Sequence, residues 1–179
     1  FFQKGLGKDV AKEFWCYRLL YASHLQQKVE EFECLADELC RVHRLDPMVQ
    51  KCCQLREALQ LGNFCKYFVL CDELSNASDV LHAKPKVAGD AVAPYYHMAF
   101  LLKLFLPHVR LRALSLVTKA YGMPLNIDVV ASKIAFGTDL DGCREFLVKS
   151  KAVLDKGGRL DCRKSNAIFM AAVAEKKMK

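Results

Sequence analysis

The sequence predicts an all-α fold with a small C-terminal β-hairpin, in which a helical-repeat, TPR-like array is followed by a winged helix. Three observations predict it. A helical pattern stops and restarts at Gly62-Asn63, four apolar helical patterns follow one another with short connections, and a run of short elements after residue 108 includes a Gly-Gly turn. The chain has 179 residues, 53% of them hydrophobic, which is enough to bury such a core.

The clearest element is the helix pair at residues 55–68, which read LREALQLGNFCKYF. The apolar pattern stops at Gly62-Asn63, where glycine tolerates a left-handed backbone and asparagine caps the next helix. It restarts with residues spaced i, i+3, i+4 and i+7, which share one helix face: Phe64, Tyr67, Phe68 and Cys71. This spacing predicts a tight antiparallel helix pair, the unit of helical-repeat scaffolds.

The array is expected to hold four helices, followed by a loop. Asp46-Pro47 starts one of them, with aspartate as N-cap and proline at the first helical position. Small and polar residues then predict a loop insertion at 75–93. The four predicted helices cover 12–25, 31–44, 47–61 and 64–74.

The second half has shorter elements. Helices are expected at 94–106 and 108–121, separated at Pro107. A short extended turn and a helix from Asn126 follow. The next helix begins at Thr138, with Asp141 at the capping-box spacing. Two strand-like runs around Gly157-Gly158 predict a hairpin, the wing of a winged helix. The predicted domains are a helical-repeat array at 1–107, a winged helix at 108–164 and a C-terminal helical tail at 165–179.

The net charge of +7 is concentrated in the second half. Residues 1–93 hold 12 Lys and Arg against 13 Asp and Glu, whereas residues 94–179 hold 15 against 7. This asymmetry indicates an acidic partner, with nucleic acid as the leading candidate. The third helix and the wing offer seven candidate nucleic-acid-binding residues: Arg144, Lys149, Lys151, Lys156, Arg159, Arg163 and Lys164.

Acidic residues are interleaved with these seven, and aromatic residues are few there because Phe146 is expected in the core. The sequence therefore favours contact with the phosphate backbone over base reading. The alternative is a solvated polar face on a winged helix that binds protein only.

No pattern indicates catalysis, a metal or a cofactor. There is no CxxC, HExxH or P-loop spacing. The nine cysteines are odd in number, and most stand among apolar residues in helical patterns, so they are expected to be free and reduced in an intracellular protein. No uncharged run of 18 apolar residues occurs, so no membrane span is expected.

A helical array that leads into a winged helix is the PCI architecture, and several segments resemble one family with it. The segments EFWCYRLLY (13–21), DPMVQKCCQLREALQLGNFCKYFVL (46–70), VRLRALSLVTKAYG (109–122) and LDC (160–162) resemble the suppressor-of-actin/GANP family of PCI-like mRNA-export scaffolds. The Ala-Leu-Gln-Leu-Gly-Asn-Phe version is closer to its leukocyte-receptor-cluster-member branch. These motifs are structural, so they identify a fold more directly than an activity.

The resemblance implies a nuclear, non-catalytic scaffold for mRNA processing or export. It also implies two partners, a second PCI-domain protein and a small acidic DSS-type peptide, and a basic surface on the joined winged helices that binds RNA. The alternative is a PCI scaffold of another complex, of the proteasome-lid, signalosome or translation-initiation type, without nucleic-acid contact.

Overall fold

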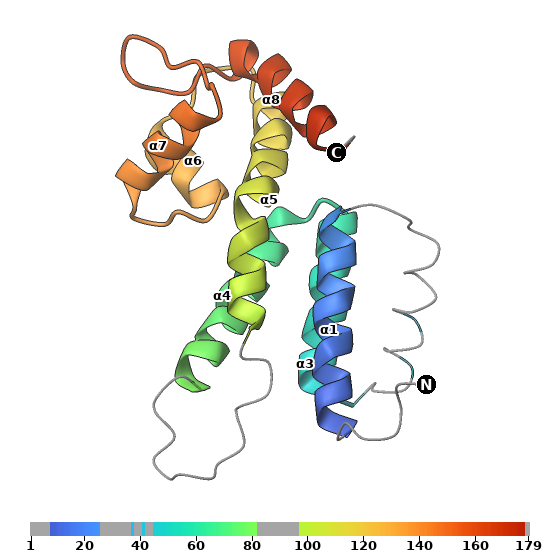
Figure 1. Cartoon of the computed structure of the whole chain (residues 1–179). Helices are drawn as coiled ribbons and strands as arrows, with labels where there is room; N and C mark the ends of the chain where they lie inside the picture. Colours follow the sequence, from blue (N-terminus) through green and yellow to red (C-terminus); the bar gives the residue numbers. More distant parts are fainter. Residues whose placement is uncertain (1–7, 26–36, 38–40, 42–44, 82–96, 178–179) are drawn as a thin grey trace. The chain divides into compact units, whose positions relative to one another are not determined.

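The structure is a computed structural model that describes residues 8–25, 37, 41, 45–81 and 97–177, and it is mostly helical (Figure 1). It divides into two compact units, Phe1–Phe105 and Leu106–Lys179, and the division falls inside one helix. The helices of the described residues are α1 (Lys8–Leu25), α3 (Pro47–Gln60), α4 (Phe64–Leu81), α5 (Met98–Ala120), α6 (Ile127–Lys133), α7 (Leu140–Lys149) and α8 (Cys162–Lys177).

The predicted helix pair of the first unit is confirmed as α3 and α4. An Asp46 carboxylate oxygen accepts hydrogen bonds from the N–H groups of Met48 and Val49 at 2.9 and 3.2 Å, which caps α3. Gly62 ends α3 with φ +68°, and the Asn63 N–H returns to the Ala58 carbonyl at 2.8 Å. The four predicted inward residues of α4, Phe64, Tyr67, Phe68 and Cys71, are all buried.

A buried histidine connects α1 to α4 and to the first half of α5. His24 Nδ1 lies 2.6 Å from the Leu20 carbonyl oxygen, and its Nε2 lies 2.7 Å from the Tyr67 hydroxyl. A carbonyl can only accept, so Nδ1 carries the proton and the hydroxyl donates to Nε2 in the neutral ring. The imidazole also stacks on Phe105, with centroids 4.3 Å apart. His24 is therefore a core residue of the first unit.

Two predictions about the array need correction or fall outside the described residues. Residues 75–81, expected to begin the loop insertion, continue α4 instead, because neither glycine nor proline interrupts them. Residues 82–93 of that insertion lie outside the described residues. So does most of the helix predicted at 31–44, of which Asp37 and Arg41 are described and helical.

The prediction of separate helices on either side of Pro107 is wrong, because α5 runs through this proline without a break. An interior proline costs a helix about 3 kcal/mol through a lost hydrogen bond and a steric clash. Buried side chains occur on both sides of it, Leu102 and Phe105 before and Val109 and Ala113 after. Burial of this apolar surface offsets the cost of the proline.

In the second unit α6 packs on α7. Ile127, Val130 and Ala131 of α6, Ile134 directly after it, and Cys143 and Leu147 of α7 are buried. The cap of α7 is Asp139, whose carboxylate accepts from the Gly142 N–H at 2.9 Å, and not the predicted Thr138. Leu140, the first residue of α7, is partly exposed.

The predicted β-hairpin is not formed as a two-stranded sheet in the described residues. Extended pairing there consists of two isolated antiparallel bridges, in which Leu160 pairs with both Leu125 and Leu154. The amides that would extend the pairing are taken by side chains. Asp155 accepts from the N–H groups of Gly157 and Arg159, both at 2.9 Å, and Ser165 Oγ accepts from the Val153 N–H at 2.9 Å. In place of the predicted hairpin, the described residues hold the single Leu154–Leu160 bridge and a tight turn at Gly158, with φ +72°. We call residues 152–162 the bridge loop.

Candidate nucleic-acid interface

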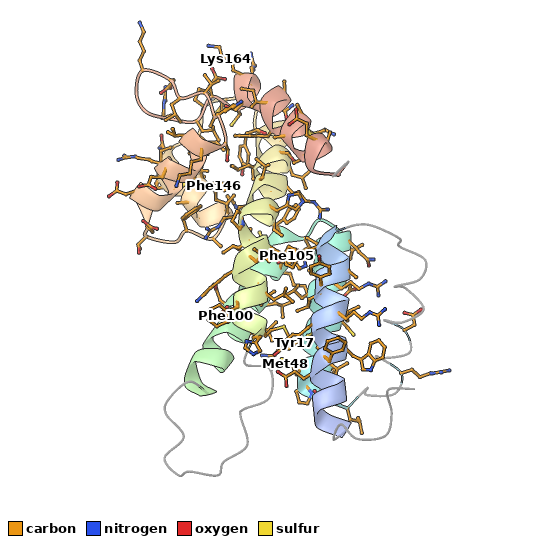
Figure 2. The ribbon with its side chains drawn as sticks, in the orientation of Figure 1. Tyr17, Met48, Phe100, Phe105, Phe146 and Lys164 are labelled. Carbon is orange, nitrogen blue, oxygen red and sulfur yellow. The ribbon has the colours of Figure 1, made fainter. Side chains whose placement is uncertain are left out.

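All seven predicted basic residues are exposed and lie in the second unit. Arg144 and Lys149 belong to α7 and Lys151 to the turn after it. Lys156 and Arg159 lie in the bridge loop. Arg163 and Lys164 stand in the first turn of α8, and Figure 2 labels Lys164 there. The structure thus distributes these cations over three neighbouring chain segments.

Four of the seven have a carboxylate partner close in sequence. Each pair lies three or four residues apart, so helix and turn geometry bring the two groups together. The nitrogen–oxygen distances are 3.7 Å for Arg144–Asp141, 3.5 Å for Lys149–Glu145, 2.8 Å for Arg159–Asp155 and 3.4 Å for Lys164–Asp161. The interleaved acids of the sequence therefore partly neutralise this surface.

Two of these carboxylates are held firmly in their charged form. A hydrogen bond from the backbone N–H of Arg159 lowers the pKa of Asp155, and one from the backbone N–H of Lys164 lowers the pKa of Asp161. Both groups stay ionised at neutral pH. A phosphate would have to compete with them for Arg159 and Lys164.

Among the described residues, Lys151, Lys156 and Arg163 make no ion pair, and we call them the unpaired cations. The bridge loop relates them in space. The Val153 carbonyl accepts from the Asp161 N–H at 2.9 Å, so the chain just after Lys151 runs beside the chain just before Arg163. Lys156 lies three residues after Val153, a separation of at most about 10 Å along even an extended chain. These three are the best-placed phosphate contacts of the predicted set.

Lys151 occupies an unusual backbone conformation for a residue with a side chain, with φ +59°. It ends α7 in a Schellman motif, in which its N–H donates to the Val148 carbonyl and the Ala152 N–H donates to the Leu147 carbonyl, both at 2.9 Å. Glycine fills the same position after α3, at Gly62. A lysine is thus held where glycine would fit with less strain.

Replacing Lys151 with glycine is expected to stabilise the second unit while weakening any phosphate binding. The left-handed conformation costs a non-glycine residue about 1–2 kcal/mol, and the greater freedom of glycine in the unfolded chain offsets about 0.5–1 kcal/mol of the gain. We expect a net rise of about 0.5 kcal/mol in the free energy of unfolding, measured in urea. Arg144→Gly, in the middle of α7, should instead lower it by about 1 kcal/mol. A loss of stability in Lys151→Gly would contradict the strain argument.

A groove that the sequence did not predict lies beside α7. It has a volume of about 410 Å³, and its lining residues all belong to the second unit: Pro107, Leu111, Phe136, Gly142, Glu145, Phe146, Lys149 and Ser150. Phe146, expected in the core, is only half-buried and helps to line it, and Figure 2 labels it on α7. Gly142, one turn before Phe146 and without a side chain, was the one sequence signal for this space.

Arg110 of α5 fixes one wall of the groove. Its Nε donates to the Ile134 carbonyl at 3.0 Å and its Nη2 to the Ala135 carbonyl at 2.6 Å, which satisfies two carbonyls at the end of α6. Its guanidinium carbon also lies 3.6 Å from the ring centroid of Phe136. Nothing in the local sequence indicated this role.

The described cysteines give no sign of a reactive thiol. Burial raises the pKa of Cys71 to about 12 and raises the pKa of Cys143 and Cys162 as well, so these thiols stay protonated at neutral pH. The expectation that all cysteines are free fails at Cys53, which is disulfide-bonded, but holds for the six others that are described.

Within the described ranges, no group of three or more His, Cys, Asp and Glu side chains is arranged to hold a metal ion. A search of the same residues finds no helix with the length and hydropathy that a membrane span requires.

Comparison with known proteins gives one informative similarity. The chain is 26% identical over 144 residues to the Schizosaccharomyces pombe protein described as THP3 homolog C2A9.11c. The aligned region covers 80% of this chain and 31% of that protein, so the chain spans about a third of the length of its relative. No protein-family model matches the chain. No solved structure matches it.

Proposed function

We propose that this chain is part of a non-catalytic scaffold subunit of a nuclear complex for mRNA processing or export, and that its second unit contacts RNA. The observation that carries the proposal is the set of exposed cations on α7, the turn after it, the bridge loop and α8, three of them without an ion pair in the described part of the chain. The relative described as a THP3 homolog is consistent with the mRNA-export scaffold family that the sequence resembles.

We interpret the second unit as a winged helix. The second half of α5, Leu125, α6, α7 and the bridge loop follow one another in the order of that fold, and Leu160 pairs with segments on both sides of α6 and α7. The bridge loop takes the place of a regular wing. On the same interpretation, the helices of the first unit form the TPR-like array that precedes a winged helix in PCI proteins.

Exposed apolar side chains support protein docking by the same unit. Val148 on α7 is 66% exposed and Met123, shortly before Leu125, is 69% exposed, although both are large and apolar. We propose that they contact a second PCI-domain protein, and that a small acidic DSS-type peptide completes the complex, as the family resemblance implies.

A second candidate function is a PCI scaffold of another complex, of the proteasome-lid, signalosome or translation-initiation type, without nucleic-acid contact. The four local ion pairs favour it, because each carboxylate lowers the local positive potential. The unpaired cations favour the RNA-binding function. We propose no catalytic role, since the buried thiols with raised pKa are poor nucleophiles.

Co-purification from the cell of origin, with and without nuclease, tests the proposed function. We expect a second PCI-domain protein to be retained after nuclease treatment, since protein contacts hold it, and RNA-dependent partners to be lost. A charged substitution at an exposed docking residue, Val148→Glu, should release the PCI protein, whereas Val69→Glu on α4, also exposed, should not. Capture of no PCI protein, or of partners that are insensitive to both nuclease and Val148→Glu, would contradict the proposal.

A further inference from the structure

The groove beside α7 has a lining that suits an aromatic group. Phe136 and Phe146 stand side by side in it, with ring centroids 5.7 Å apart and planes inclined by 46°. Pro107 and Leu111 of α5 supply further apolar surface. Its volume of about 410 Å³ falls in the range of about 300–1,000 Å³ that is usual for small-molecule sites.

The groove is built before any ligand arrives. Arg110 holds Phe136 through its stacked guanidinium and anchors the preceding two carbonyls, so the ring has little freedom to move. Gly142 lines the groove together with Phe146. A Cβ at this position would lie 2.1 Å from an Asp139 carboxylate oxygen, the group that caps α7. The cap of α7 therefore requires a glycine at a position that also lines the groove.

The charges around the groove indicate what kind of aromatic group would enter. Lys149 lines the groove and lies two residues before Lys151, one of the unpaired cations. Glu145 Oε2 is 3.5 Å from Lys149 Nζ, so the carboxylate is compensated at the rim and leaves no net negative charge there. An aromatic group that is linked to phosphates matches an apolar groove next to cations, whereas a purely apolar peptide would leave the cations unused.

We propose that this groove accepts one unpaired nucleobase of a single strand whose phosphates contact the unpaired cations. The inference rests on the proposed RNA contact and adds a stacking site to it. It predicts that single strands are preferred over duplexes, because a paired base cannot turn out of its stack without an energetic cost.

The test compares two single strands of equal length on the full chain, one with bases and one with abasic sites in the middle. Both carry the same phosphates. Base–aromatic stacking contributes about 1–3 kcal/mol per base, so the complete strand should bind about 5- to 150-fold more tightly than the abasic strand. Phe146→Leu should reduce its affinity to that of the abasic strand and leave abasic binding unchanged, which also shows that the fold persists. Phe100→Leu, the same change at an exposed position in the first unit, should alter neither.

The outcomes separate this inference from the proposed function. Equal binding of both strands, weakened by reversal of the unpaired cations, would overturn the base site and leave the RNA contact in place. Binding of neither strand would overturn both. If Phe146→Leu left both strands unaffected but released the second PCI-domain protein, the groove would be a protein contact and the base site would be wrong.

Discussion

Replacing Arg110 with methionine is expected to destabilise the second unit by about 2–4 kcal/mol, because two hydrogen bonds from a charged donor and a stacked cation are lost together. Methionine keeps much of the apolar stem of arginine, so the loss of stability measures the contribution of the guanidinium group. The carbonyls of Ile134 and Ala135, at the end of α6, would lose their Arg110 donors. The stability of Arg110→Lys should fall between those of the wild-type chain and Arg110→Met, because an ammonium keeps the charge without the planar fork.

Amide hydrogen exchange resolves this effect by unit. In Arg110→Met the slowest amides of α6 and α7 should exchange about 30- to several-hundredfold faster, whereas those of α3 and α4 should keep their rates and serve as an internal control. Arg144→Met removes an exposed cation of α7 and should change stability by less than about 0.5 kcal/mol. Unchanged exchange in α6 and α7 of Arg110→Met would show that Arg110 does not hold this wall of the groove.

Much of the first unit could be predicted because its signals are local. Asp46 caps a helix two and three residues away, and Gly62 and Asn63 end one helix and cap the next through contacts within five residues. The inward face of α4 followed from helical spacing alone. Such features need no knowledge of the remaining chain.

Two of the failures, the break expected at Pro107 and the expected hairpin, have a common physical cause, since both depend on contacts between residues distant in sequence. Pro107 reads as a helix break locally, and only burial on both sides of it explains why α5 continues. The hairpin was expected as a ladder because its two runs look like strands. Instead Leu160 pairs with Leu125, 35 residues earlier in the sequence, as well as with Leu154. The Val153 N–H donates to the Ser165 hydroxyl and is not available for a ladder.

The sequence predicted which basic residues form the candidate site, but not their ion pairs or the groove beside α7. All seven basic residues are exposed, as a binding surface requires, but the sequence could not show which of them would have carboxylate partners. The groove escaped prediction because Phe136 and Phe146 meet only after α6 and α7 pack together, and because Arg110 reaches Ile134 and Ala135 from 24 and 25 residues away.

The proposed RNA contact depends on the three unpaired cations, Lys151, Lys156 and Arg163. Their simultaneous reversal to glutamate should nearly abolish binding of a single-stranded RNA. All three side chains are exposed, so folding should hardly change. The control reverses Lys51, Lys66 and Lys103, three lysines of the first unit, and lowers the formal net charge of +7 by the same six units. Lys51 and Lys66 pair with Glu73 and Glu57, so circular dichroism checks that this variant is folded.

The most direct measurement is RNA affinity across a salt series for the wild-type chain and for these two variants. Three phosphate contacts to a single strand give a log–log slope of about −2, so raising the salt from 50 to 200 mM should weaken wild-type binding about twentyfold. The control should keep this slope, and the reversal of Lys151, Lys156 and Arg163 should bring it close to zero with weak binding at every salt concentration. An unaltered slope and affinity in that variant would contradict the account and leave the second unit as a protein-docking module.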